Sequence, residues 1–280
     1  MSRLQQIIAT AVLLSIILSG QSSDKWTPDV SIELKSISQL QFSPSGNQLA
    51  MVVRKALIEG EKSEYLNQIW MSRLESNSPH QFTYGDKSAS RPRFSPDGKH
   101  LAFISERTEE SQVWVMRTDG GEARQFSYEK ESVSNFEWSP NGTQIAFLMK
   151  DSKTEEEEEQ EKEKRDVIIV DENFKYSHIY VKQFATEVDT NGANRITEGS
   201  FSVNSFNWSP DSRRIVFAHS LEPTFNSRSI SGDISVVSLS DKSMTILVEW
   251  PGVDADPVFS PDGKWVAFAS DGGKIERIGL

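Results

Sequence analysis

Short apolar runs separated by polar, turn-forming segments fill this chain from about residue 37 to its end. A clear example is the run Leu101 to Ile104, which follows Phe94 and the turn-forming segment Ser95 to Gly98. Runs of this length bounded by proline, aspartate and glycine are typical of β-strands joined by tight turns. The pattern therefore predicts an all-β chain made of successive hairpins.

The same hairpin sequence recurs through the chain with small variations: an aromatic residue, then Ser-Pro-Asp-Gly, then a short apolar run. Proline presets φ at the first corner of a turn, aspartate or asparagine suits the second, and glycine takes a positive φ. Copies spaced at roughly 45–70 residues indicate a solenoid, a propeller or another array. The aromatic residues that begin the five copies are Phe42, Phe94, Trp138, Trp208 and Phe259.

A second hairpin follows each of the first four copies. In the second repeat the turn signal Asp119-Gly120-Gly121 separates the apolar runs 113–116 and 123–126. Two hairpins supply four strands, which is the content of one propeller blade. The prediction is a β-propeller of four-stranded antiparallel blades, and the alternative is a β-sandwich with similar turns. Related second hairpins lie at 69–82, 179–196 and 234–248.

The repeats divide the chain into a linker at 23–36 and a propeller at 37–280. Within the linker, Val30 to Leu34 alternates between apolar and polar residues and predicts a lone strand, and Glu59 to Glu64 predicts a solvated loop in the first blade. Four complete blades and a partial fifth would leave an unpaired sheet edge. We therefore expect either the front part of a longer protein or a shortened copy of one. The expected blades are 37–83, 90–127, 135–197, 205–249 and the partial 256–280.

The first 22 residues have the layout of a secretory signal peptide. Arg3 precedes an uncharged apolar run, Ile7 to Leu18, and small residues follow it. The run is too short to span a bilayer comfortably. Cleavage after Gly20 or Ser22 and a periplasmic or secreted location are expected. A retained N-terminal membrane anchor is the alternative, and no other contact with a membrane is expected.

An acidic insertion at 151–166 interrupts the third blade. Glu158 with Lys162, and Glu161 with Arg165, have the i,i+4 spacing of helical ion pairs. The five consecutive glutamates nevertheless favour an extended, solvated loop or a frayed helix. The alternative to a simple surface excursion is an acidic lid or docking arm for a cationic partner.

Charge and composition exclude several classes of function. The net charge of −11 argues against a sequence-independent grip on nucleic acid, which requires a basic face. The chain has no cysteine, so disulfides, thiolate metal sites and cysteine nucleophiles are excluded. Neither the phosphate-binding Gly-x-x-x-x-Gly-Lys-Ser/Thr nor the dinucleotide-binding Gly-x-Gly-x-x-Gly sequence occurs. No cofactor is expected.

No catalytic, cofactor-binding or metal-binding residue is predicted. The Gly-x-Ser-x-Gly nucleophile elbow of α/β-hydrolases is absent from the sequence. The repeat serines occupy turns, where a hydroxyl bonds the local backbone. The four histidines, His80, His100, His178 and His219, form no metal-binding spacing. The alternative for the repeat residues Asp97, Asn141, Asp211 and Asp262, which are expected to form turns, is calcium binding.

Five tryptophans are expected at repeat-equivalent strand positions, where they would pack between blades. The alternative role is a ligand-stacking surface. These residues are Trp70, Trp114, Trp138, Trp208 and Trp265.

The repeated sequence resembles the propeller repeats of TolB-type periplasmic proteins and of the N-terminal domains of prolyl oligopeptidase family serine peptidases. The acidic insertion followed by Val170 to Tyr176 and Ile179 to Val181 is similar to a segment of the bacterial dipeptidyl and acylaminoacyl peptidase branch. TolB-type proteins usually carry an α/β domain before the propeller, whereas the repeats here begin near residue 37.

The resemblance implies a non-catalytic role. In that peptidase family the propeller covers a C-terminal α/β-hydrolase domain and admits peptides while excluding folded proteins. The catalytic triad lies in the hydrolase domain, which is absent from this sequence, so no catalytic residue carries over. The chain is expected to be the substrate-gating propeller of a secreted serine peptidase, meeting peptide substrates through the parent enzyme. The alternative is a stand-alone TolB-like interaction scaffold.

Overall fold

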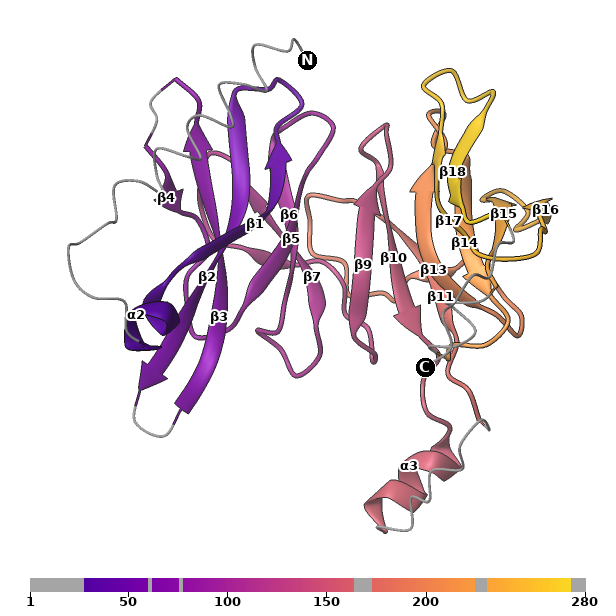
Figure 1. Ribbon diagram of the computed structural model, residues 1–280, viewed down its shortest axis with the longest axis horizontal. Helices are drawn as coiled ribbons and strands as arrows, with labels where there is room; N and C mark the ends of the chain where they lie inside the picture. Colours follow the sequence, from indigo (N-terminus) through magenta and orange to yellow (C-terminus); the bar gives the residue numbers. More distant parts are fainter. Residues whose placement is uncertain (1–27, 60–61, 76–77, 164–172, 225–230, 273–280) are drawn as a thin grey trace.

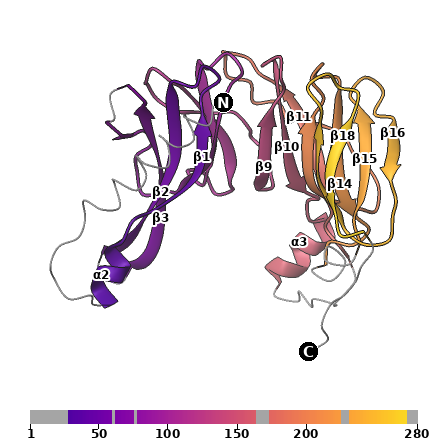
Figure 2. The same cartoon turned by 45° about the horizontal axis from the view of Figure 1, so that its top comes forward.

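The structure is a computed structural model that describes residues 28–59, 62–75, 78–163, 173–224 and 231–272. Within these ranges the chain forms four four-stranded antiparallel sheets and then one two-stranded sheet. The sheets stand side by side in an open arc (Figures 1 and 2). The predicted fold of propeller blades is therefore confirmed.

Strands that are consecutive in sequence are neighbours within every sheet. The first sheet contains β1 (Ser36–Phe42), β2 (Gln48–Glu59), β3 (Lys62–Arg73) and β4 (His80–Gln81). The second contains β5 (Ala89–Phe94), β6 (His100–Ser105), β7 (Gln112–Arg117) and β8 (Arg124–Gln125). The third contains β9 (Val133–Trp138), β10 (Gln144–Lys150), β11 (Ser177–Gln183) and β12 (Asn194–Arg195). The fourth contains β13 (Ser202–Trp208), β14 (Arg214–Ser220), β15 (Asp233–Ser238) and β16 (Met244–Val248), and the fifth contains β17 (Asp254–Phe259) and β18 (Val266–Ser270).

The Ser-Pro-Asp-Gly segment closes the hairpin between the first two strands of each blade. The Ser95 hydroxyl donates to Asp97 Oδ1 at 2.6 Å and accepts from the His100 backbone N–H at 3.0 Å. The hydrogen bond from the Ser95 hydroxyl, and to a smaller extent that from the Lys99 N–H, holds the pKa of Asp97 below its ordinary value. The same serine-to-Asp/Asn hydrogen bond occurs at residues 139, 209 and 260. These serines and acids form turns, as their positions in the repeat predict.

Glycine is favoured in this turn because φ is positive there, +72° at Gly142, although Ser212 takes the equivalent position of the fourth blade with φ +60°. A Cβ there would meet Pro96 of the preceding blade at 3.5 Å, an ordinary contact, so the penalty for alanine is conformational. We expect Gly142→Ala to lower the free energy of unfolding by about 1–2 kcal/mol. Urea denaturation measures this. Gly192→Ala is the control, because Gly192 has no positive φ; equal effects of the two substitutions would contradict the argument.

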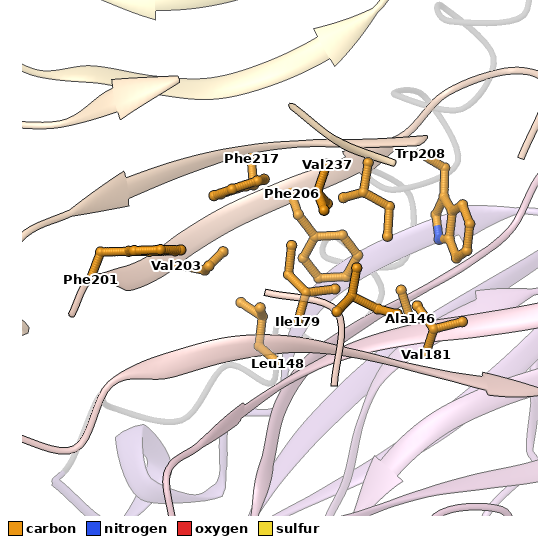
Figure 3. Close-up of a cluster of buried hydrophobic side chains, with 12 residues drawn as sticks. Ala146, Leu148, Ile179, Val181, Phe201, Val203, Phe206, Trp208, Phe217 and Val237 are labelled. Atoms are coloured by element: carbon orange, nitrogen blue, oxygen red, sulfur yellow. The ribbon is translucent and has the colours of Figure 1, made fainter. Parts of the chain in front are cut away.

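The core lies between the sheets, because alternating residues of each second strand face opposite neighbours. Leu101 and Phe103 of β6 join the cluster shared with the first sheet, whereas Ala102 and Ile104 join the cluster shared with the third. Figure 3 shows the equivalent layer between the third and fourth sheets, where side chains of β10 and β11 meet those of β13 and β14. A strand buried on both faces must be apolar throughout, which explains the continuous apolar runs in the sequence.

Two of the five tryptophans also connect neighbouring blades by hydrogen bonds. The indole of Trp138 donates to the Arg93 carbonyl at 3.2 Å, and that of Trp208 donates to the Glu137 carbonyl at 3.3 Å. The prediction that all five tryptophans pack between blades is wrong for Trp265. This residue follows the turn of the fifth sheet and is 75% exposed, because no described sheet covers that side of β18.

A buried polar bracket ties the third strand of a blade to the connection that leads into the next blade. Gln112 accepts from the Ser127 hydroxyl at 2.6 Å and donates to the Glu129 and Glu131 carbonyls. Gln68 makes the corresponding contacts in the first blade. In the third blade the bracket position is His178, whose Nδ1 lies 3.2 Å from Thr197 Oγ1 and whose Nε2 has no hydrogen-bond partner. The rigid imidazole cannot reproduce the reach of the glutamine amide.

Two local predictions fail near the first blade. The linker segment predicted as a strand forms the helix α2 (Pro28–Glu33) instead. Proline suits the first turn of a helix because its missing N–H is not needed there, and five alternating residues are too few to specify a strand. The predicted loop at 59–64 is also shorter than expected, because Lys62 pairs with Glu59 and Ser63 with Ile58 across the β2–β3 ladder. Residues 60 and 61 lie outside the described residues.

The acidic insertion contains a capped helix, α3 (Glu155–Lys162), instead of the expected extended loop or frayed helix. Thr154 and Glu157 form a reciprocal capping box, which satisfies two free N–H groups at the helix start. Lys130 pairs with Glu158, and Lys175 pairs with Glu157. Figure 1 shows the helix projecting from the third sheet with no sheet packed around it. Arg165 lies outside the described residues, so the predicted pair with Glu161 is untested, and Glu161 pairs with Lys153 at 2.7 Å.

The expected signal peptide at 1–22 lies outside the described residues, as do part of the linker and the end of the fifth blade. None of the helices that the structure describes is long and apolar enough to cross a membrane.

Candidate binding site at the mouth of the propeller axis

The first strand of each sheet lies nearest the propeller axis. β1 contacts β5, β5 contacts β9, and β13 contacts β17. Each of these strands carries a β-bulge near its beginning. At the bulges Gln39, Arg91 and Asp256 have φ near +50°. A bulge turns a side chain away from the regular pleat, and of these three residues Arg91 lines a cavity at this end of the axis.

A cavity of about 440 Å³ opens at this end of the axis. Its wall crosses four consecutive sheets, from Arg91 on β5 to Asp254 on β17. Arg91 Nη1 donates to Asn135 Oδ1 at 3.3 Å, which joins the second and third sheets at the wall. A volume of this size suits a small molecule or a few residues of an extended peptide. The other polar lining residues are Ser134, Lys150, Ser177 and Asn204.

The cavity has cationic and anionic ends. Arg91 and Lys150 supply positive charge from the second and third sheets, and Asp254 supplies negative charge from the fifth. Asp233 is near Asp254, and its pKa is raised by burial and then by the charges of Glu249 and Asp254. The chain enters the acidic insertion directly after Lys150, so α3 is rooted at the rim of the cavity.

A buried serine–histidine pair is unsuited to nucleophilic catalysis. His219 Nε2 lies 2.9 Å from Ser235 Oγ, but both residues are buried and His219 Nδ1 has no hydrogen-bond partner. A catalytic dyad requires a reachable nucleophile and a group that orients the base. Burial lowers the pKa of His219 to about 4, as it does that of His178, where the charge of Arg195 adds to the effect.

The other residues considered from the sequence are dispersed. His80 is exposed at the start of β4, and His100 lies edge-on to Phe184. Within the described residues there is no group of three or more histidine or acidic side chains arranged to hold a metal ion. The four repeat Asp/Asn side chains all accept hydrogen bonds from turn serines.

Sequence reasoning missed Asp254, although the repeat contains a signal for it. Asp254 pairs with Ser270 in the register in which Ala89 pairs with Ser105, Val133 with Met149 and Val203 with His219. In the first blade Ile37 pairs with Val53 in the same register, so the position is apolar in the first four blades and acidic in the fifth. An alignment of the inner strands, as well as of the turns, would have exposed the exception.

These features define a β-propeller with a polar cavity at the mouth of its axis. Residues 63–165 match the N-terminal β-propeller domain of tricorn protease. The chain is 29% identical over 273 residues to dipeptidyl-peptidase 5 of Porphyromonas gingivalis, which covers 88% of this chain and 39% of that protein. It is 36% identical over 81 residues to the uncharacterized peptidase YuxL of Bacillus subtilis, covering 29% of this chain and 12% of that protein. The chain thus spans less than half the length of these relatives.

Solved structures show the same fold. An acylaminoacyl peptidase of Pyrococcus horikoshii superposes with a TM-score of 0.62 at 20% identity, covering 90% of this chain and 38% of that one. A TolB protein of Agrobacterium tumefaciens gives a TM-score of 0.50 at 15% identity, covering 84% of this chain and 90% of that one. The chain is a β-propeller similar to those of peptidases and of TolB proteins, and the resemblance predicted from its repeats is confirmed.

Proposed function

We propose that this propeller is the substrate-gating part of a secreted serine peptidase of the dipeptidyl or acylaminoacyl type, acting with an α/β-hydrolase domain. The observation that carries the proposal is the polar cavity at the mouth of the axis, in a propeller whose relatives by sequence are peptidases. An opening of this size admits an extended peptide segment, whereas a folded protein is too large to enter it. The chain's role is to select and orient substrates.

The gating role predicts a preference for peptides over folded proteins. A small folded protein and its own tryptic digest would be offered to the purified chain in equilibrium dialysis, with peptides quantified by mass spectrometry. We expect peptides to be retained and the intact protein not to be. Retention of the intact protein alone would contradict gating and favour a TolB-like interaction scaffold. A fluorophosphonate probe is expected to label no serine, and specific labelling would contradict a non-catalytic role.

Secretion is also part of the proposal and rests on the leader-like sequence at residues 1–22. Expression in a Gram-negative host followed by intact-mass measurement of the periplasmic fraction tests it. We expect a chain shortened by 20 or 22 residues. A full-length chain retained in the membrane would instead support an N-terminal anchor.

A further inference from the structure

One carboxylate at the cavity has no hydrogen-bond partner in the structure. Asp254 is 2% exposed, and neither of its side-chain oxygens has a hydrogen-bond partner. A buried, ionised carboxylate is costly unless it is paired. Its own backbone is firmly placed, because the Asp254 N–H donates to the Gly232 carbonyl at 3.0 Å.

The fold does not require an acid at this position. The equivalent residues Ala89, Val133 and Val203 are equally buried, with exposures of 1–2%, and belong to the apolar core. An apolar side chain therefore fits this position of the repeat without cost. The carboxylate of the fifth sheet is the exception, and it lines the cavity.

The surroundings of Asp254 favour a cation. The negative charges of Glu249 and Asp254 both act on Asp233, so the acidic groups lie together at this end of the cavity. A metal ion is a poor match, since the described residues contain no group of three potential acidic or histidine ligands. An organic cation needs fewer ligands, because one carboxylate and nearby neutral acceptors satisfy an ammonium or guanidinium group. Ser134 and Asn204 supply such acceptors along the cavity wall.

We propose that Asp254 binds a primary ammonium or guanidinium group carried by the peptide that enters the cavity. Arg91 and Lys150, at the other end of the cavity, then face the carbonyl or carboxylate groups of the same peptide. This orients an extended peptide with its cationic group toward the fifth sheet. The inference rests on the proposed function in so far as the ligand is a peptide.

Isothermal titration calorimetry on the whole chain tests the cation site. The ligands are n-butylammonium and three alanine-based tripeptide amides, and the affinity of each is measured. One tripeptide carries only a free amino terminus, one is acetylated with a central arginine, and one is acetylated with no cation. We expect at least one cationic tripeptide to bind about tenfold or more tightly than the neutral one, the discrimination of a charge-assisted hydrogen bond. Comparison of the two cationic tripeptides identifies the source of the cation.

The variants Asp254→Asn and Asp254→Val should remove this preference. Valine is the residue at the equivalent position 203, so Asp254→Val should retain the fold and its thermal midpoint should not fall. If the thermal midpoint of the valine variant does fall, the asparagine variant provides a second test. Asp256→Asn on the same strand is the matched control, because Asp256 is exposed and is not among the residues that line the cavity, and it should keep the preference. An equal preference for cationic peptides in wild type and both Asp254 variants would overturn the proposal.

These binding measurements distinguish failure of the proposed cation site from failure of the proposed peptide gating. Binding of n-butylammonium to wild type but not to Asp254→Val, without binding of any peptide, would support the site and contradict peptide gating. Equal binding of all three tripeptides to wild type and to both Asp254 variants would support peptide gating and contradict the site.

Discussion

Replacing Phe147 with alanine is expected to lower the free energy of unfolding by about 3–5 kcal/mol, the usual cost of removing a fully buried phenylalanine. Phe147 lies at the centre of β10 with no exposed surface. It belongs to the cluster between the second and third sheets and stacks on Tyr180, with ring centroids 6.2 Å apart. The void left by the deleted phenyl ring would lie between two sheets, each held by its own backbone hydrogen bonds, so the surrounding residues can move little to fill it. Urea denaturation followed by circular dichroism measures the change.

Trp265→Ala is the matched control for this substitution. It removes a larger aromatic ring, but one that is 75% exposed, so the free energy of unfolding should change by less than about 0.5 kcal/mol. If both variants lost similar stability, the core would not lie between the second and third sheets as described. If Phe147→Ala lost none, the same conclusion would follow.

Acidification from pH 7 to pH 4 is expected to destabilise the fold through two buried histidines. Both His178 and His219 have a pKa of about 4 in the folded chain, below the 6.5 of an ordinary histidine. Between pH 6.5 and pH 4 the unfolded chain binds more protons than the folded chain does. The contribution of these two histidines to the free energy of unfolding is therefore complete above about pH 6.5 and is lost as the pH falls toward 4. Each histidine contributes about 3 kcal/mol over this window. Urea denaturation at pH 7, 5.5 and 4 measures the slope.

The variants His178→Gln and His219→Gln isolate this effect. Each should flatten the pH dependence between 6.5 and 4, because glutamine does not titrate. His178→Gln also places at position 178 the residue that forms the bracket at Gln68 and Gln112. A third variant combines His178→Gln with His219→Gln. If the free energy of unfolding of the wild type fell no more steeply with pH than that of this double variant, the two imidazoles would not resist protonation in the fold.

The fold was predictable because the information is local and repeated. The Ser-Pro-Asp-Gly turn specifies its own backbone through Asp97 and Gly98, and the apolar runs specify strands buried on both faces. Five copies of one signal outweigh the ambiguity of any single copy. The bracket at Gln112, by contrast, joins residues that are 15 to 19 positions apart in sequence. None of these residues belongs to a recognisable motif, so the sequence alone does not predict the contact.

The candidate site could not be predicted in the same way. The cavity forms where bulges in several first strands meet at the axis, and the β-bulge at Arg91 depends on pairing between strands, which a turn motif does not encode. Asp254 is unusual only in relation to its repeat equivalents. Helix α3 differs from the predicted loop because the capping box at Thr154 and the cations of Lys130 and Lys175 offset the mutual repulsion of the five glutamates.

The alternation along each second strand has a thermodynamic consequence. Leu101 supports one neighbour and Ala102 the other, so loosening one sheet uncovers the faces of both adjoining sheets. Folding cooperativity is therefore passed along a line from sheet to sheet, as in an array with nearest-neighbour coupling. Under such coupling the interior members of the row are held from two sides, and backbone amides of β10 should exchange with deuterium more slowly than those of β18.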